Sequence, residues 1–246
     1  MGNNKKTRTV HIVGRNESIK GMFIHHGWAP VNDLQQADLV QFTGGADVFP
    51  GFYGEEPLNT TRFDKERDDY EKAVFESAIG LGLPCAGICR GAQFVHVMNG
   101  GKLWQHVLGH ATGRNHVAKI DHTAFINPGQ MRKEYGETMF VSSTHHQMMK
   151  YDAVASRCVR VLTANVSTYK QDGKSTSFCG LPRDGAFDVE AMYYPATNTF
   201  SYQPHPEYFG ITDPCQTFYF RCLKQFLFSK VKIVGNGGAD DNDGPW

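Results

Sequence analysis

The sequence predicts a single α/β domain built on a mostly parallel sheet with helices on both faces. Strand-like and helix-like segments alternate along the chain, and this alternation places parallel strands side by side with helices above and below them. The length of 246 residues lies within the range of one large domain. No internal repeat or domain boundary interrupts the pattern, so we expect one domain over residues 7–230 and a disordered polar tail over 231–246.

The first half of the chain is expected to form three strands and their helices. Apolar residues recur at helical spacing over 64–80, which predicts a helix there. A second helix should follow Cys89 and end at Asn99-Gly100-Gly101. The loop over 43–63 is long enough to be functional. The expected elements are a strand over 9–14, helical or turn-rich sequence over 17–27, a strand over 38–42, a helix over 64–80, and a strand up to Cys89 followed by a helix.

The second half is expected to add strands and one closing helix. Residues 166–188 are polar and carry no clear pattern, so they read as an insertion whose role the sequence leaves open. The expected strands cover 116–120, 138–142, 158–164, 189–194 and 199–203, and the closing amphipathic helix covers 219–228.

A sharp strand-to-helix turn is predicted around Cys89. Gly87 and Gly91 stand two residues to either side of it, after a buried-looking run and before a helical one. Glycines let neighbouring backbone approach closely, so the side chain at the centre of such a turn stands exposed. The dipole of the following helix favours the thiolate, which is the reactive form of cysteine. The pattern predicts a nucleophile, whereas Cys89 without partners would read as a small core residue.

A base and its orienting acid are predicted near the C-terminus. His205 and Glu207 are two residues apart in a Pro-rich segment, so in extended backbone they project to the same side. A thiol nucleophile needs a base, and the base needs an acid to orient it. The flanking prolines, Pro204 and Pro206, restrict the backbone and suit a fixed loop at a strand end.

Backbone donors for an oxyanion are predicted after the strand that ends at Phe42. The step Gly44-Gly45 can present N–H groups toward a ligand, and the N–H of Arg90 follows the nucleophile directly. An acyl-transfer enzyme needs such donors where the tetrahedral oxyanion develops.

Together these motifs resemble the class I glutamine amidotransferase-like superfamily, which has a Gly-x-Cys-x-Gly-x-Gln turn and a His-Pro-Glu near the C-terminus. Within it, the chain is most similar to the γ-glutamyl hydrolase and γ-glutamyl-γ-aminobutyrate hydrolase branch, peptidase C26. The likeness extends from about the first strand to the helix after Glu207, with the motifs in the family's order. The further segments that fit are 44–48, 53–55, 67–71, 89–91 and 143–147.

The resemblance implies the flavodoxin-like fold of class I glutamine amidotransferases and a thiol amidohydrolase that cleaves γ-glutamyl amides through a thioester. It implies no cofactor. By the same resemblance Cys89, His205 and Glu207 form the catalytic triad, and Gly45 and Arg90 the oxyanion hole. The residues implied near the substrate are Gly44, Gln93, Ser143, His145 and His146. One departure is Pro204, which stands where the family usually has an aromatic residue.

The leaving group stays open on sequence alone. A γ-glutamyl amine or peptide would make the chain a stand-alone hydrolase, and the segment 53–55 with Arg90 favours this branch. Ammonia would make it a glutaminase that feeds a separate synthase subunit, since the chain has no Gly-x-x-x-x-Gly-Lys-Ser/Thr loop for ATP. A catalytically silent scaffold is a third alternative, which the intact Cys, His and Glu disfavour. An α/β-hydrolase with a cysteine nucleophile is disfavoured, because in that fold the acid lies well before the histidine in sequence, whereas Glu207 follows His205.

The 11 histidines raise the alternative of a metal site. His106 and His110 are four residues apart, but Gly109 indicates a turn between them and no His-Glu-x-x-His pattern is present. The sequence therefore predicts no metal.

Composition excludes several partners. Lys plus Arg and Asp plus Glu number 25 each, so no overall field attracts nucleic acid or an anionic membrane. No apolar run approaches the roughly 20 residues that cross a bilayer, and no hydrophobic stretch follows the basic N-terminal residues. The 6 cysteines form no Cys-x-x-Cys pair and have no regular spacing, so we expect them to be reduced thiols. We expect a cytoplasmic enzyme with a small-molecule γ-glutamyl substrate, and a homo-oligomer is left open.

Overall fold

The structure is a computed structural model that describes residues 7–111, 115–151, 154–164, 170–171, 176–177 and 188–229. Most of the expected insertion over 166–188 and the whole expected tail over 231–246 lie outside these residues. The strands are β1 Thr9–Val13, β2 Ala29–Pro30, β3 Leu39–Phe42, β4 Cys85–Ile88, β5 Lys102–Trp104, β6 His106–Val107, β7 His116–Ile120, β8 Thr138–Val141, β9 Met148–Lys150, β10 Val159–Ala164, β11 Lys170–Gln171, β12 Thr176–Ser177, β13 Val189–Tyr194 and β14 Thr199–Tyr202.

The helices are mostly short and begin at side-chain caps. Asn16, Asp64, Asn127 and Asp213 each accept a hydrogen bond from a backbone N–H in the first turn of α1, α2, α4 and α5, which satisfies a donor that has no partner inside the helix. The α-helices are α1 Glu17–His25, α2 Lys65–Gly80, α3 Arg90–Met98, α4 Pro128–Tyr135 and α5 Pro214–Cys222; a π-helical segment, η5 Leu223–Leu227, follows α5, and the short 3₁₀ helices are η1 Leu34–Gln36, η2 Pro50–Tyr53, η3 His122–Ala124 and η4 Pro206–Tyr208.

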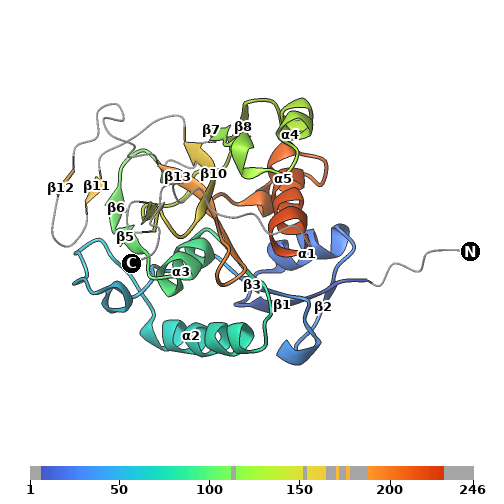
Figure 1. The fold of residues 1–246 in the computed structure, drawn as a ribbon. Coiled ribbons are helices and arrows are strands. Elements are labelled where there is room, and N and C mark those ends of the chain that lie inside the picture. Colours follow the sequence, from blue (N-terminus) through green and yellow to red (C-terminus); the bar gives the residue numbers. More distant parts are fainter. Residues whose placement is uncertain are drawn as a thin grey trace, which may run out of the picture.

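A nine-stranded sheet forms the centre of the molecule, in the order β2-β1-β3-β4-β14-β13-β10-β7-β8 (Figure 1). The strands from β2 to β14 pair in parallel, and those from β14 to β8 pair antiparallel. The predicted α/β architecture is confirmed, and its parallel part holds Cys89. The antiparallel part was not evident from the sequence, because strand pairing across this part of the sheet leaves no local signal.

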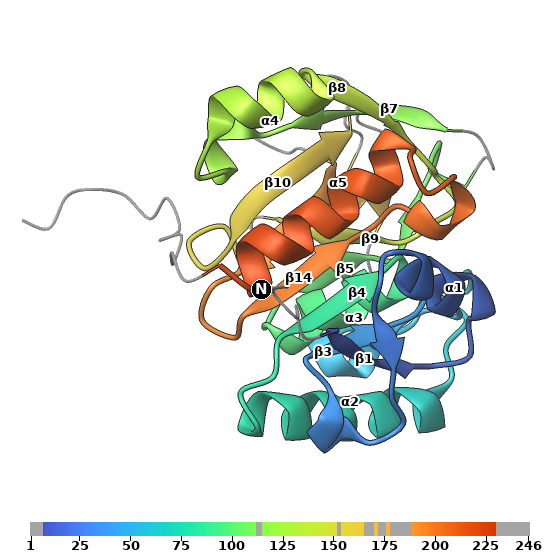
Figure 2. The same ribbon diagram turned by 90° about the vertical axis from the view of Figure 1, so that its right-hand side faces the viewer.

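Helices cover both faces of the sheet, as predicted. α1 and α5 lie on one face and α2 and α3 on the other (Figures 1 and 2). Side chains along one strand point alternately to the two faces, so Leu39 packs into the core under α1 and α5 while Val40 packs into the core under α2 and α3. Each face buries a continuous apolar cluster, which fixes the strand register and with it the positions of the loops at the strand ends.

The closing helix begins earlier than predicted. The sequence suggested 219–228, but α5 starts at Pro214 after the cap at Asp213, whose carboxylate accepts from the N–H of Cys215. Proline at the first helical position is favoured because its missing N–H would have no partner there. The elements that the sequence did not indicate are α4, the pair β5–β9 and the small sheet of β6, β11 and β12.

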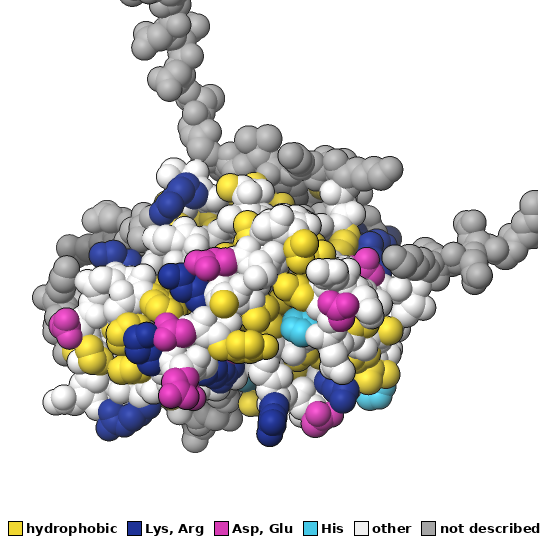
Figure 3. All heavy atoms as spheres, turned by 90° about the horizontal axis from the view of Figure 1, so that it is seen from below, with side chains coloured by type: hydrophobic (Ala, Val, Ile, Leu, Met, Phe, Trp, Pro, Cys, Tyr) yellow, Lys and Arg dark blue, Asp and Glu magenta, His cyan; other side chains and the backbone are white. Residues whose placement is uncertain are grey.

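The surface over α2 mixes charges of both signs (Figure 3). Two of its pairs are Lys65–Asp69 and Lys72–Glu76, each four residues apart on the helix. This exposed face is hydrated, and its alternating charges create no extended region of positive or negative potential. No helix in the described part of the chain is long and apolar enough to span a membrane.

Candidate active site

Cys89 occupies the strained turn between β4 and α3 that the sequence predicts. Its φ of 54° and ψ of −114° lie in a region that residues other than glycine rarely adopt. The residue is 9% exposed. It directly precedes the first turn of α3, where the free backbone N–H groups and the helix dipole favour a negative charge.

The two flanking glycines are required by close backbone contacts. A Cβ on Gly87 would lie 2.1 Å from the carbonyl oxygen of Gly91, and a Cβ on Gly91 would lie 2.3 Å from that of Phe42. Neither neighbour is a flexible side chain that could move away. The turn at Cys89 is therefore wedged between β4, α3 and the end of β3, and its backbone geometry is held by packing on all sides.

His205 and Glu207 form a directly hydrogen-bonded pair. His205 Nδ1 lies 2.7 Å from Glu207 Oε1, and the Glu207 side chain is fully buried. The carboxylate therefore holds the proton on Nδ1 and leaves Nε2 for the thiol. Burial lowers the pKa of His205, but the hydrogen bonds and charges of Cys89 and Glu207 outweigh it and raise this pKa to about 10. His205 is thus a strong acceptor for the Cys89 proton.

Three neighbours fix the position of this pair. Ser142 accepts a hydrogen bond of 2.6 Å from the N–H of His205. Gln216 of α5 donates to the carbonyls of Pro206 and Phe209 at 3.0 Å each, which ties the His-Pro-Glu turn to a helix. Tyr208 stacks on the imidazole with ring centroids 4.4 Å apart and planes 4° apart. An aromatic ring therefore covers the histidine even though Pro204 precedes it.

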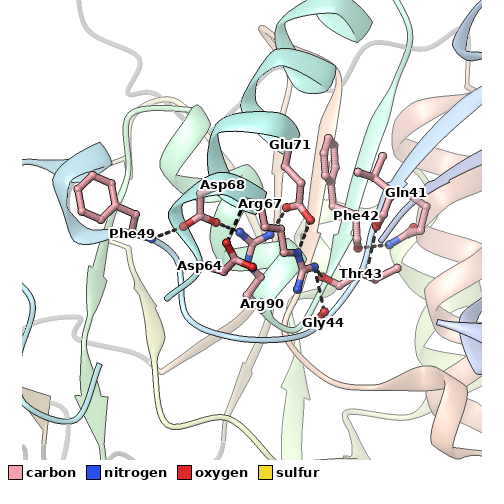
Figure 4. A network of polar contacts seen from close by, with 11 residues as sticks. Gln41, Phe42, Thr43, Gly44, Phe49, Asp64, Arg67, Asp68, Glu71 and Arg90 are labelled. Carbon is pink, nitrogen blue, oxygen red and sulfur yellow. Dashed lines mark hydrogen bonds and ion pairs between the residues drawn. The ribbon is translucent and has the colours of Figure 1, made fainter. Parts of the chain in front are cut away.

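The Gly44–Gly45 turn lies against the thiol and the imidazole. A Cβ on Gly44 would be 3.3 Å from His205 Cε1 and 3.7 Å from Cys89 Cβ. Gly45 has a φ of 146°, and a Cβ there would be 2.1 Å from Arg67 Nη1. The Arg67 guanidinium also donates to the carbonyl of Gly44 at 3.1 Å (Figure 4). Arg67 thus lies against the far side of the turn, where the positive φ and the close contact require glycine at position 45, and a side chain at position 44 would crowd His205.

Arg90 directs its side chain away from the thiol into a buried ion-pair network. The guanidinium donates to Asp68 and to Glu71 of α2 (Figure 4). Asp68 also accepts a 2.7 Å hydrogen bond from the N–H of Phe49, and Glu71 accepts one from Arg67. Burial lowers the pKa of Arg90 to about 9, with repulsion from Arg67 adding to the effect, so the side chain stays charged at neutral pH. The network joins the turn at Cys89, the Gly44–Gly45 turn and α2.

Two of the expected substrate residues, Gln93 and His146, have protein partners. Gln93 is buried on α3, and its Nε2 donates to the carbonyl of Gln147 at 2.9 Å and to Gln203 Oε1 at 3.1 Å. His146 is partly exposed, and its Nε2 lies 2.9 Å from Asp47 Oδ1. The hydrogen bond to Asp47 raises the pKa of His146. Both remain predictions as substrate contacts.

Two more of the expected substrate residues, Ser143 and His145, lie in a buried cluster of histidines and carboxylates, and the fifth, Gly44, lies in the glycine turn described above. Ser143 Oγ donates to the carbonyl of His110 at 2.7 Å. The ring of His145 lies 4.8 Å from that of His110, centroid to centroid, and its Nε2 is 3.8 Å from Glu190 Oε2. Each is at most 4% exposed, and their role at the substrate also remains a prediction.

Several residues around the site were missed by sequence reasoning. Ser142, Tyr208 and Gln216 contact His205 or the residues that follow it, and Arg67 contacts the Gly44–Gly45 turn, but only Arg67 lies in a segment quoted for the resemblance. No local pattern signalled the partners of Arg90: Asp68 and Glu71 are three residues apart on α2, and only the structure shows that both are buried. Acidic side chains on a buried face require a cationic partner, and Arg90 beside the nucleophile provides it.

The family follows from comparison with known proteins. A family model described as Peptidase C26 matches residues 30–207. The chain is 34% identical over 128 residues to the glutamine amidotransferase-like protein YvdE of Lactococcus lactis, and the match covers 48% of this chain and 53% of that protein. The chain thus spans about half the length of this relative.

Solved structures share the fold at low sequence identity. A glutamine amidotransferase of Thermotoga maritima superposes with a TM-score of 0.54 and 14% identity, over 89% of this chain and 84% of that chain. The glutaminase domain of Trypanosoma brucei CTPS does so with a TM-score of 0.51 and 14% identity, over 93% and 97%. With the family match, this fold identifies the chain as a member of the peptidase C26 family within the class I glutamine amidotransferase-like superfamily.

Proposed function

We propose that this protein hydrolyses a γ-glutamyl amide bond through a thioester on Cys89. The observation that carries the proposal is the strained turn that presents Cys89 beside His205, with Glu207 at 2.7 Å from the far nitrogen of the same imidazole. A nucleophile, a base and an orienting acid in this order are the parts of a thiol hydrolase. Membership of the peptidase C26 family supports the same class of reaction.

The first half of the reaction forms the thioester. His205 takes the proton of Cys89, and the thiolate attacks the δ-carbonyl carbon of the γ-glutamyl group. The resulting imidazolium is stabilised by Glu207, whose carboxylate lies at hydrogen-bond distance and is shielded from water. His205 then gives this proton to the departing nitrogen, so the leaving group departs as a neutral amine or ammonia.

The second half regenerates the enzyme. Water enters as the leaving group departs, His205 removes its proton, and the hydroxide attacks the thioester carbonyl. Glutamate leaves and Cys89 recovers its proton from His205. No cofactor takes part in this sequence, because proton transfer and nucleophilic attack are sufficient for amide hydrolysis.

The N–H groups of Gly45 and Arg90 are proposed to stabilise the oxyanion in both halves. The N–H of Arg90 opens α3, where the first N–H groups of a helix have no partner within it. Among the hydrogen bonds of the described residues, none uses the N–H of Gly45. The Gly44–Gly45 turn is adjacent to both reacting side chains. Donors fixed in this way need no reorganisation as charge develops.

The substrate is proposed to present its glutamyl end toward Gly44, Gln93 and His146. His146 is the cationic candidate among them, because Asp47 raises its pKa and about a third of its side chain is exposed. A protonated imidazole there would attract the α-carboxylate of a glutamyl group. A γ-glutamyl amine is the favoured substrate.

The test measures amine, ammonia and glutamate release by the purified full chain from glutamine and from a panel of γ-glutamyl amines. Cys89→Ala should abolish release. Cys85→Ala is the matched control, since burial raises the pKa of the Cys85 thiol to about 12 and keeps it inert. Its activity should stay within a few-fold of the parent.

The outcomes separate the alternatives. Turnover of γ-glutamyl amines that depends on Cys89 supports the stand-alone hydrolase. Turnover of glutamine alone contradicts it and favours a glutaminase that supplies a separate synthase, an arrangement that the likeness in fold to a protein of Thermoplasma acidophilum described as a GMP synthase subunit brings into consideration. Release that Cys89→Ala retains would contradict the thioester mechanism itself.

A further inference from the structure

A cluster of three histidines and two carboxylates lies outside the triad and has no part in the reaction above. His110 precedes β7, His116 opens it, His145 lies in the loop before β9, and Glu190 is on β13 with Asp188 just before it. The side chains of Asp188 and Glu190 are fully buried, and those of His110 and His145 are at most 2% exposed. Burying two carboxylates in this way is costly unless positive charge lies beside them.

The outer nitrogen of each inner histidine is held by a hydrogen-bond acceptor. His145 Nδ1 lies 2.9 Å from the carbonyl oxygen of Gln147, and His110 Nε2 lies 3.1 Å from Asp188 Oδ2. These acceptors keep the protons on the outer nitrogens. The lone pair of His145 Nε2 then faces inward, which is the arrangement that metal-binding histidines share, and His110 Nδ1 also points toward Glu190 while it lies 3.3 Å from Ser143 Oγ, a contact that it would exchange for a bound ion.

The inner atoms face one another across a gap too wide for hydrogen bonds. His145 Nε2 is 3.8 Å from Glu190 Oε2, and His110 Nδ1 is 3.5 Å from Glu190 Oε1. One donor atom from each of the three residues lies within 4.8 Å of the others. Two ligands bound at about 2.0–2.1 Å to one tetrahedral ion are about 3.3 Å apart, so the three side chains would move closer together around a small cation.

Several polar atoms that line this gap lack a hydrogen-bond partner within the described part of the protein. Among the described residues, His145 Nε2 and both carboxylate oxygens of Glu190 have no hydrogen-bond partner. His116 Nε2 lies 3.1 Å from Glu190 Oε1, but the two atoms are not aligned for a hydrogen bond. Buried polar atoms without partners are rare in native proteins and point to a missing ligand.

We propose that His110, His145 and Glu190 bind a divalent transition-metal ion of the zinc class, with His116 completing the site. Imidazole and carboxylate ligands in a four-coordinate arrangement suit Zn²⁺ best. The ion would join β13 to the segments at 110 and 145, which are far apart in the chain. This role is structural, and it assigns His145 to the metal in place of the substrate contact expected from sequence.

The site also adjoins the support of the triad. The carbonyl of Gln147 accepts from both His145 and Gln93, and the carbonyl of Glu190 accepts from the N–H of Gln203 at 2.7 Å. Gln203 is two residues before His205. The ion would therefore stabilise the loop and the strand that lie beside the triad without contacting the reacting atoms.

The test measures zinc content and thermal stability of the full chain. Cys89→Ala serves as the parent for this test. It removes the Cys89 thiol, so Cys89, His205 and Glu207 can no longer act together as a second zinc-binding group. After treatment with a chelator and addition of one equivalent of Zn²⁺, we expect one tightly bound zinc per chain and a raised Tm. Glu190→Gln and His145→Gln should each weaken zinc binding at least tenfold. His122→Gln, which alters a buried histidine 3.5 Å from another carboxylate, should leave binding unchanged.

Two further measurements guard against variants that fail to fold. Asp188→Asn leaves the three ligands in place and should weaken zinc binding about 10–100-fold by releasing the outer nitrogen of His110. Addition of Co²⁺ to the unmutated ligand set should give the strong visible absorption of a tetrahedral site. Absence of zinc and of this absorption in the parent would overturn the proposal, as would a folded Glu190→Gln chain that binds zinc as tightly as its parent.

Discussion

Two buried regions of this molecule bring histidine and carboxylate side chains together, and the geometry differs between them. At the carboxyl end of β14, His205 and Glu207 are 2.7 Å apart in a direct hydrogen bond. In the antiparallel part of the sheet, His145 and Glu190 are separated by 3.8 Å, and both facing atoms lack a hydrogen-bond partner. The first geometry suits the proton transfer proposed for His205, whereas the second suits the proposed metal ion.

This difference shows why residue type alone does not assign a role. Both regions are buried, and both pair imidazole with carboxylate. What separates them is the outer nitrogen: the acid itself holds it in His205, while other acceptors hold it in His110 and His145. Replacing the glutamate by glutamine should therefore reduce activity in the first region and zinc binding in the second.

The largest expected effect is that of Glu207→Gln on catalysis. Loss of the carboxylate removes the partner that fixes the tautomer of His205 and stabilises its charge, so kcat should fall about 10²–10⁴-fold. Steady-state kinetics on the preferred γ-glutamyl substrate, together with zinc content, provide the measurement. Glu190→Gln is the matched variant and should lose zinc first. If Glu207→Gln lost zinc instead, the division between the two regions would be wrong.

A second comparison concerns the charges that hold the catalytic turn. Arg90→Met would leave Asp68 buried without its cation and Glu71 with Arg67 as its remaining cationic partner, and we expect a loss of about 3–5 kcal/mol in the free energy of unfolding. Lys72→Met breaks an exposed pair with Glu76 on the same helix and should cost at most about 1 kcal/mol. Urea denaturation of both variants gives the numbers. Equal losses would show that the buried network contributes no more than a surface pair.

His96 offers a histidine of a third kind, which bonds to no carboxylate. Its nitrogens lie 2.6 Å from the hydroxyl of Tyr194 and 2.9 Å from the carbonyl of Lys102. Burial lowers the pKa of His96 from 6.5 to about 4. Between these values the unfolded chain binds the proton and the folded chain does not, so His96 should reduce stability as the pH falls from 6.5 to 4.

This loss should reach about 3 kcal/mol at pH 4, because each unit of pKa shift corresponds to about 1.36 kcal/mol. Unfolding free energies of the parent and His96→Gln, measured from pH 7 to pH 4, test it. The variant should lose less stability on acidification than its parent. Parallel pH profiles for the two chains would contradict the assignment of a neutral, buried His96.

The smallest expected effect contrasts an open glycine with the crowded ones at the catalytic turn. A Cβ on Gly21, inside α1, would meet nothing within 4 Å, whereas one on Gly91 would meet the backbone of Phe42. Gly21→Ala should raise the free energy of unfolding by about 0.5–1 kcal/mol through reduced chain entropy and better helix propensity. Thermal unfolding measures it, and a lower Tm than the parent would contradict the open space at Gly21.

The turn at Cys89 and the pairing of His205 with Glu207 were predictable because each motif lies within a few consecutive residues. The spacing of Gly87, Cys89 and Gly91 specifies a turn by itself, and His205 and Glu207 are separated by a single residue. The alternation of strands and helices likewise predicted the α/β fold and most strand positions. These features depend on local backbone geometry, which short sequence patterns describe well.

The other contacts were not predictable, because they join distant parts of the chain. Arg90 meets Asp68 only when α2 packs against the catalytic turn, and His110, His145 and Glu190 meet only through the antiparallel pairing of the sheet. The expectation of no metal rested on spacing in sequence, where His106 and His110 were the candidates. In the structure the ring of His106 lies 6.1 Å from that of His146, centroid to centroid, and the proposed site uses His110 with residues distant in sequence.

The central claim is that Cys89 carries the γ-glutamyl group during the reaction. Mass spectrometry of the protein quenched in acid during turnover tests this most directly, with peptide mapping to locate the adduct. We expect a γ-glutamyl adduct on the peptide that contains Cys89, and none in Cys89→Ala. Turnover of the same substrate with no adduct on any cysteine, or with the adduct on another residue, would contradict the account.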